Sequence, residues 1–227
     1  MPKSLHPDLT HSVEDYLKAI YALSEDGSPA STTRIAELLD LSAPSVSGMV
    51  KRLAEQGLLE HLPYKGVTLT GDGRAVALRM VRRHRLIESY LVAFLGYTWD
   101  TVHDEAERLE HAVSDELVER MAEALGNPVT DPHGDPIPAA DGTVLEVRTV
   151  ALPQVPIGET VRLARVETGD AERLRWFAEV GLMPGAMLRV VGVQPFDGPV
   201  TVERDGSAQV VGFAMASLLR CARGGSA

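Results

Sequence analysis

Residues 33–70 carry the pattern that most constrains the fold, because two short helices are followed directly by a β-hairpin. The first helix has an apolar side made by Ile35, Leu38 and Leu39. Ser42 is a plausible N-cap for the second helix, which tolerates Pro44 in its first turn and ends before Gly57. The runs LLEHL, PYKG and VTLT then predict strand, turn and strand. This order of elements predicts a winged helix-turn-helix.

A winged helix binds DNA by placing its second helix in the major groove. Small and hydroxyl side chains there permit close approach, while cations can meet phosphate or guanine. The helix before it begins with threonines, and its free amides favour phosphate. The candidate DNA contacts are Thr32, Thr33, Ser42, Pro44, Ser45, Gly48, Lys51, Arg52 and, at the hairpin tip, Lys65. Alternatively, Lys51 and Arg52 are ordinary solvated charges.

The distribution of charge reconciles this prediction with a net charge of −10, which is unusual for a nucleic-acid binder. Residues 1–95 carry 11 basic and 11 acidic side chains, so the whole imbalance lies in residues 96–227. Residues 100–123 alone hold nine acidic and two basic side chains. A charge run of this kind is usually a solvated helix face.

Composition places the chain among folded globular proteins, since 44% of its 227 residues are apolar. The length suits one large domain or two to three small ones. Cys221 is the single cysteine, which excludes an internal disulfide and fits a reduced, cytoplasmic setting. The N-terminal residues MPKSLHPDLTHSVEDY lack an apolar core, and no run reaches 18 apolar residues, so we expect neither a signal peptide nor a membrane span.

The pattern of apolar residues changes twice in the rest of the chain. Helical spacing predicts long helices over about 73–94 and 100–125, followed by a proline- and glycine-rich connector over 126–142. Alternating apolar runs separated by glycine turns then predict five or so short strands around one helix at 171–180. The predicted fold is mainly α with small β, with domains over 1–73, 74–142 and 143–227, the last a small β-barrel.

The acidic helix also carries two histidines. At 100° per residue, four potential ligands fall within an arc of about 100° beside an apolar stripe. They are His103, Glu107, Glu110 and His111. Imidazole and carboxylate groups converging at the edge of a core can hold a divalent cation. The alternative is an exposed acidic face on which the histidines occur by chance.

The pair His84 and Glu88, and the residue Asp15, can each be interpreted either as metal ligands or as ordinary structural residues. His84 and Glu88 form an i, i+4 pair on the preceding helix, and antiparallel packing would bring them to His103. Alternatively they are a surface pair. Asp15 either closes a capping box with Ser12 or is a ligand that ties the DNA-binding domain to the metal domain.

Several motifs in this order resemble the diphtheria-toxin-repressor family of iron- and manganese-dependent repressors. They are VEDYLKAIY, SAPSVSGMVKRL, RRHRLIE, VHDEAERLEH and DPHGDPIP. GLMPG at 181–185 resembles the SH3-like domain of the same family, which also occurs in ferrous-transport accessory proteins. The resemblance implies a repressor of metal-homeostasis genes. It implies a homodimer formed through the helical domain, which binds a palindromic operator when Fe(II) or Mn(II) is bound.

The resemblance also implies ligand sets. The primary site matches Asp15, Glu107, Glu110 and His111, and the ancillary site matches His84, Glu88 and His103. Asp131 stands where some manganese-responsive relatives place a cysteine ligand. The third domain would add Asp170, with Glu172 as the second choice.

Some residues of this chain differ from the iron-type members of the family, and these differences affect which metal ion we expect it to prefer. Iron-type members have sulfur ligands where Asp15 and Glu107 stand, and hard oxygen ligands favour Mn(II) over Fe(II). Lys18 replaces a second N-terminal carboxylate of the small two-domain manganese regulators. Arg173 replaces an amide ligand of the iron-type ancillary site, so both sites are expected to differ in detail.

Three other functions fit parts of the pattern. A winged-helix regulator could sense an organic ligand, with the acidic helix as mere surface. A carboxylate–histidine metalloenzyme is a second, although di-iron bundles repeat Glu-x-x-His, and here Glu107 and His111 are four apart without a second copy. The third domain could instead bind a protein partner. We expect no enzymatic activity, no small organic substrate and no membrane association.

Overall fold

The computed structural model describes residues 9–223 except 26, 63 and 146. These residues form two compact units, one of residues up to 84 with 138–143, the other of residues 85–137 with 144 onward. The division into three domains stays a prediction. The first eight residues, on which the expectation of no signal peptide partly rests, lie outside the described part. Within that part, no helix is long and apolar enough to cross a membrane.

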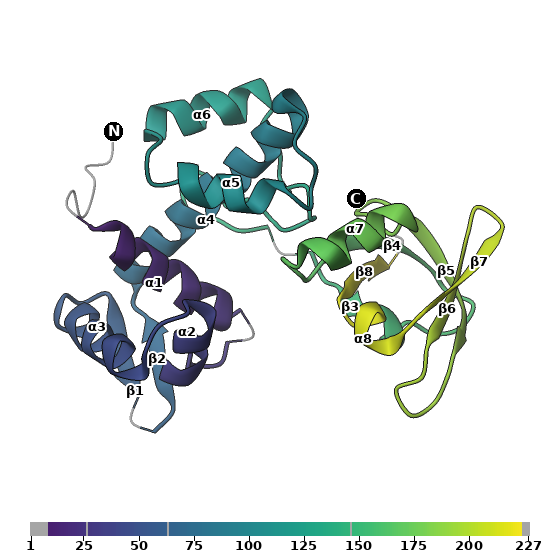
Figure 1. The fold of residues 1–227 in the computed structure, drawn as a ribbon, viewed down its shortest axis with the longest axis horizontal. Helices are drawn as coiled ribbons and strands as arrows, with labels where there is room; N and C mark the ends of the chain where they lie inside the picture. The colour runs from purple at the N-terminus through teal and green to yellow at the C-terminus, as the bar shows by residue number, and fades with distance from the viewer. Residues whose placement is uncertain (1–8, 26, 63, 146, 224–227) are drawn as a thin grey trace. The chain divides into compact units, whose positions relative to one another are not determined.

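The first unit is a winged helix (Figure 1). Its elements are α1 (His11–Leu23), α2 (Thr32–Leu38), α3 (Ala43–Glu55), β1 (Leu59–Leu62), β2 (Gly66–Leu69) and the first part of α4 (Gly71–Leu95). The strands are antiparallel, with Leu59 opposite Leu69. Ser31 and Ser42 cap α2 and α3 by accepting hydrogen bonds from backbone amides three residues later. The predicted helix–turn–helix and hairpin are confirmed.

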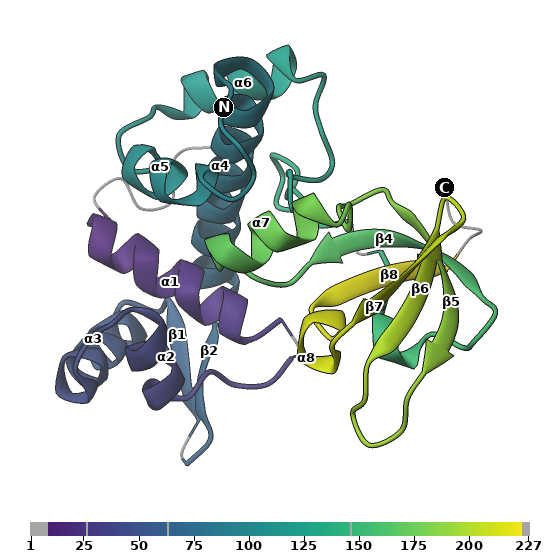
Figure 2. The same ribbon diagram turned by 45° about the vertical axis from the view of Figure 1, so that its right-hand side comes forward.

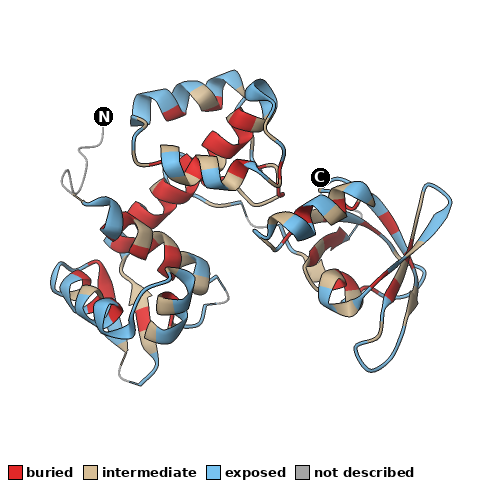
Figure 3. Cartoon of the chain, viewed as in Figure 1, coloured by how far each residue is buried: buried red, intermediate tan, exposed pale blue. Residues whose placement is uncertain are grey.

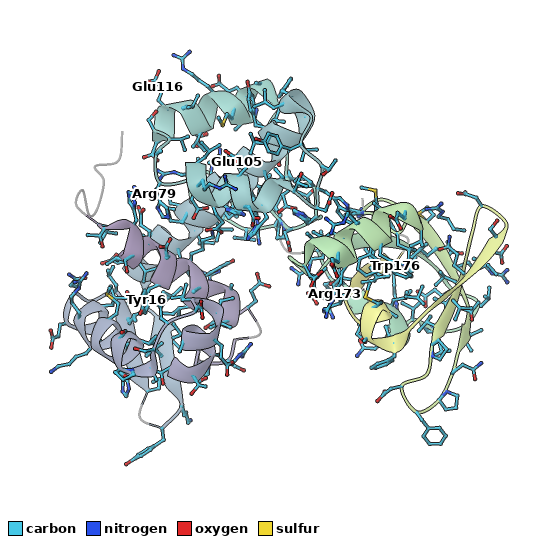
Figure 4. All side chains as sticks on the ribbon, viewed as in Figure 1. Tyr16, Arg79, Glu105, Glu116, Arg173 and Trp176 are labelled. Carbon is cyan, nitrogen blue, oxygen red and sulfur yellow. The ribbon has the colours of Figure 1, made fainter. Side chains whose placement is uncertain are left out.

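An apolar core holds this unit together. Leu17 and Ile20 of α1, Leu53 of α3 and Val67 of β2 are fully buried in it. Tyr16, labelled in Figure 4, belongs to the same cluster. Figure 3 shows buried residues recurring along the inner faces of α1 and α3. Helical spacing of apolar residues therefore places these helices around one core.

The start of α1 differs from the sequence prediction. The helix begins at His11 with Thr10 as its N-cap residue, and the backbone carbonyl of Thr10 accepts from the amide of Val13. Ser12 therefore lies inside the first turn, and its predicted capping box with Asp15 is wrong. The role of Asp15 as a metal ligand stays a prediction.

The second unit contains the C-terminal part of α4 with α5 (Val102–Leu109) and α6 (Asp115–Ala124). The predicted single helix over 100–125 is wrong, because Ser114 accepts a hydrogen bond from the amide of Leu117 at 3.2 Å and begins a new helix. Glu110 is the C-cap residue of α5. Leu117, near the start of α6, is 42% exposed.

The rest of this unit is a small antiparallel sheet (Figure 2). Its elements are β3 (Val150–Ala151), β4 (Thr160–Val166), α7 (Ala171–Glu179), β5 (Met187–Val193), β6 (Val200–Arg204), β7 (Ser207–Val211), α8 (Phe213–Ala216) and β8 (Leu219–Arg223). The strand order is β3-β8-β4-β5-β6-β7, and α7 covers the core with Leu174 and Phe177. Among the described residues β3 and β7 are edges, so the SH3-like sheet is not closed into a barrel.

Candidate metal centre and DNA-binding face

The end of α4 and the helix α5 bring several predicted ligands together. The Nδ1 atom of His103 lies 3.2 Å from Oε1 of Glu88, and its Nε2 atom lies 3.7 Å from Oε1 of Glu107. Nε2 of His111 lies 3.7 Å from Oε1 of Glu110, whose side chain is fully buried. Packing of α5 on the C-terminal part of α4 thus produces the contact between Glu88 and His103 that we expected from the sequence.

A second group forms around the other oxygen of Glu88. Oε2 lies 3.7 Å from Nδ1 of His133, and the same nitrogen lies 3.9 Å from Oδ2 of Asp131. Each of the three residues offers one ligand atom, these atoms lie within 4.8 Å of one another, and all three residues are buried. Two carboxylates and one imidazole in a buried group are suited to a divalent cation.

Sequence reasoning missed His133, which the structure places in this group. The motif DPHGD held a signal, since Asp131 and His133 stand two residues apart in a connector rich in proline and glycine. Its two aspartates and one histidine have the types that ligate hard metals. The resemblance to the family points to Asp131 alone, because only that residue matches a ligand position in relatives.

The loop itself positions these side chains. Oδ1 of Asp131 accepts from the backbone amides of His133 at 2.8 Å and Asp135 at 2.9 Å, which closes the turn. Its other oxygen, Oδ2, faces Nε of Arg85 at 3.7 Å as well as the His133 ring. Asp131 therefore has one oxygen committed to the turn and one directed at the candidate metal group.

Hydrogen bonding fixes which nitrogen of His133 faces the carboxylates. Nε2 donates to the backbone carbonyl of Trp99 at 2.7 Å, which leaves Nδ1 toward Glu88 and Asp131. Burial lowers the pKa of this ring, but hydrogen bonds and negative charge from Asp131 and Glu88 outweigh that effect and raise the pKa to about 11. The ring is therefore cationic beside its two carboxylates. The donation to Trp99 is the arrangement that orients metal-binding histidines.

The small sheet is joined to this loop. The backbone carbonyl of His133 accepts from the amide of Val166 at 3.0 Å, and Arg165 pairs with Asp135 at 3.2 Å. Gly134 adopts φ +88° and lies so close to β4 that an added Cβ would be 2.0 Å from the carbonyl oxygen of Ala164. The loop that carries Asp131 and His133 is thus built against the small sheet.

The remaining predicted ligands are Asp15, His84 and Asp170, with Glu172 as the second choice. Asp15 is on α1 in the first unit, and its role as a ligand stays a prediction. His84 is buried one turn before Glu88 on α4, and its Nδ1 lies 3.2 Å from Nζ of Lys18. Asp170 is the N-cap of α7, where it accepts from the amide of Arg173 at 2.9 Å. Glu172, the second choice, is exposed.

The predicted DNA contacts are accessible to solvent on the winged helix. Thr32 is half-buried, and the others are exposed: Thr33, Ser42, Pro44, Ser45, Gly48, Lys51, Arg52 and Lys65. The hydroxyls of Ser42 and Ser45 lie 2.9 Å apart at the start of α3. Lys51 lies 4.0 Å from Glu55, an exposed pair that water weakens. These cations therefore remain accessible to phosphate.

Comparison with known proteins accounts for nearly the whole chain. The model of the iron-dependent repressor N-terminal DNA-binding domain matches residues 8–67, that of the metal-binding and dimerisation domain matches residues 70–139, and that of the FeoA domain matches residues 150–223. The iron-dependent repressor IdeR of Mycobacterium leprae is 35% identical over 195 residues, covering 81% of this chain and 85% of that protein. This chain belongs to the diphtheria-toxin-repressor family.

Solved structures of the family agree with the fold. A manganese-dependent transcriptional repressor in complex with manganese aligns with a TM-score of 0.85 at 43% identity, covering 93% of this chain and 99% of that one. The manganese regulator SloR aligns with a TM-score of 0.77 at 39% identity, covering 95% and 100%. The diphtheria toxin repressor of Corynebacterium diphtheriae is 32% identical over 212 residues, covering 88% and 91%.

Membership establishes the broad function. This chain is an iron- or manganese-dependent transcriptional repressor that binds operator DNA and dimerises with a second copy. The family consists of DNA-binding repressors and not of enzymes. The metalloenzyme and organic-ligand alternatives are therefore set aside, and the prediction of a metal-sensing regulator is confirmed.

Proposed function

We propose that this repressor responds to Mn(II) in preference to Fe(II), and that Glu88, Asp131 and His133 hold one of its metal ions. One observation carries the proposal. His133 donates from Nε2 to the carbonyl of Trp99 and turns Nδ1 to the two buried carboxylates. Loss of a proton from Nδ1 leaves a lone pair directed at the group. Carboxylate-rich donors without sulfur favour Mn(II).

The remaining predicted ligands fall into two sets under this proposal. One set consists of Asp15, Glu107, Glu110 and His111. The other set contains Glu88, together with His84, His103 and, from the third domain, Asp170. The first set is supported by Glu110, which is fully buried and lies 3.7 Å from His111, another member of the set. The contact between His103 and Glu88 supports the second.

The proposed switch follows from charge. A bound divalent cation supplies the positive charge that offsets repulsion among the clustered carboxylates. Asp15 then joins Glu110 and His111 and holds α1, and with it the winged helix, in the DNA-binding arrangement. Such a population shift needs a few kcal/mol of differential binding. Two winged helices related by a two-fold axis would read a palindromic operator.

Three finer predictions accompany this function. The repressor acts in the cytoplasm, takes no small organic substrate, and controls genes of metal homeostasis. The third domain contacts the DPHGD loop, which supports a role in shaping the metal site over a role confined to an outside protein partner.

Operator binding measured by fluorescence anisotropy on a duplex from the gene's own upstream region tests the proposal. We expect tight binding with Mn(II), weaker binding with anaerobic Fe(II), and none with chelator. His133→Ala should weaken the Mn(II) response, whereas His61→Ala, an exposed histidine on β1, should leave metal affinity unchanged. A stronger response to Fe(II) would reverse the metal assignment. A normal metal response in His133→Ala would remove this group from the site.

A further inference from the structure

Lys18 of α1 contacts a predicted metal ligand in a way that bears on metal affinity. Its Nζ lies 3.2 Å from Nδ1 of His84, and the pair is partly buried. Both residues belong to the same compact unit. Lys18 stands on the helix that carries Asp15, the other predicted ligand of this unit.

The chemistry of the two groups fixes the direction of this hydrogen bond. An ammonium group has three donors and no acceptor, so Nδ1 of His84 must accept. A neutral imidazole has one ring nitrogen with a lone pair and one with a proton. The proton of His84 is therefore on Nε2 in this arrangement, and the lone pair of Nδ1 is engaged by Lys18.

Coordination of a metal by His84 uses the same lone pair. If coordination is through Nδ1, Lys18 has to leave. If it is through Nε2, the proton moves to Nδ1, which then cannot accept from Lys18. The hydrogen bond and metal coordination at His84 therefore exclude each other, whichever nitrogen is the ligand atom.

We propose that Lys18 is an internal competitor of the metal at His84, a positioning residue that sets the metal concentration at which the repressor responds. In the metal-free protein Lys18 holds α1 to the His84 ring through its ammonium group. Coordination by His84 releases that contact, so α1 exchanges an attachment at Lys18 for the proposed one at Asp15. This inference rests on the proposed role of His84 as a ligand.

The test is a Mn(II) titration of the full-length protein followed by calorimetry, with Lys18→Met and Lys18→Gln compared with the wild type. Removing one hydrogen bond to a charged group should tighten one class of site about tenfold. Arg34→Met removes an exposed cation from the same unit and is the matched control for net charge; it should leave the affinity unchanged. In a His84→Gln background, Lys18→Met should have little effect, as a double-mutant cycle requires.

Nitrogen-15 NMR of labelled histidine in metal-free protein supplies a second readout. We expect His84 in the wild type to carry its proton on Nε2, and the Nδ1 signal to move in Lys18→Met. Equal tightening by Lys18→Met and Arg34→Met, unchanged affinity in both Lys18 variants, or a proton on Nδ1 in the wild type would overturn the inference. Failure of the wild type to bind Mn(II) or Fe(II) at all would instead overturn the proposed function.

Discussion

The interior of the winged helix and the interior around the end of α4 are built on opposite principles. The first is a cluster of apolar side chains from α1, α2, α3 and the hairpin. The second buries charged groups, among them Glu88, Glu110, Asp131 and His133. Burial of apolar surface stabilises a fold directly, whereas buried charges cost free energy unless they are paired. The winged helix is therefore stabilised by its apolar core. In the charged interior, a bound cation can change the free energy of the buried carboxylates.

The two interiors should accordingly respond to different perturbations. Loss of apolar volume should reduce the free energy of unfolding without changing metal affinity in the charged interior. Loss of a charged group there should lower metal affinity, and it should also lower the free energy of unfolding because its buried partner is left unpaired. The following predictions run from the largest expected effect to the smallest.

Leu53→Ala should strongly destabilise the apolar core of the winged helix. Leu53 is fully buried on α3, and large-to-small changes in such cores cost about 2–5 kcal/mol. Urea denaturation of the metal-free protein measures the loss. Leu38→Ala, at a 54% exposed position on α2, is the control and should cost less than about 1 kcal/mol. A large loss of affinity at the Glu88 group in Leu53→Ala would show that the two interiors are not independent.

Glu88→Gln should weaken metal binding in the charged interior. The substitution keeps the shape and removes the charge that faces both His103 and His133. Calorimetry with Mn(II) should show an affinity about a hundredfold lower, equivalent to ~2.7 kcal/mol. Glu116→Gln, on an acidic residue that points into solvent from α6 (Figure 4), should have no such effect. Similar losses in both variants would mean that overall charge, and not this group, governs affinity.

Gly134→Ala tests whether the packing of the DPHGD loop against β4 holds the charged interior in place. A Cβ there would collide with the Ala164 carbonyl and would also occupy a backbone region that disfavours side chains. We expect a loss of about 2 kcal/mol in stability, together with weaker Mn(II) binding. Gly158→Ala shares the positive φ, at +90°, but has open space around its Cβ. Equal effects of the two substitutions would show that backbone strain, and not the approach to β4, accounts for the loss.

Lys65→Ala should have the smallest effect, confined to DNA affinity. Lys65 is exposed at the hairpin, where we predict a phosphate contact. Removing one such contact should weaken operator binding a few-fold and reduce the salt dependence of log affinity by about 0.9. Anisotropy at several salt concentrations measures both. Arg189→Ala, an exposed cation on β5, should leave the salt slope unchanged, and an equal change in that variant would remove the wing contact.

Sequence patterns predicted the winged helix well because its helices pack one apolar face on a local core. Periodicity failed at residues 100–125, where apolar spacing continues across a break made by Ser114. A serine there is compatible with a helix interior or a cap, and only the packing of the following turn decides. The same limit applied to Ser12, which lies inside α1 because Thr10 begins the helix.

The candidate ligands divide in a similar way. His103, Glu107, Glu110 and His111 were recognisable because they share a helix or its end. His133 was not, because its contact with Glu88 depends on a loop that returns to a distant helix. Lys18 was noted from sequence only as a departure from relatives, and its hydrogen bond to His84 required the packing of α1 on α4.

By itself, the sequence determined the winged helix, the helical segment with its acidic candidate ligands, the short strands and the family. These depend on spacing along the chain, where neighbouring residues impose geometry on each other. Tertiary structure alone decided the partner of Glu88, the tautomer-fixing contact of His133 with Trp99, and the open edges of the small sheet. Those features join residues that are far apart in sequence, and their energies depend on burial and hydrogen bonding that exist only in the folded chain.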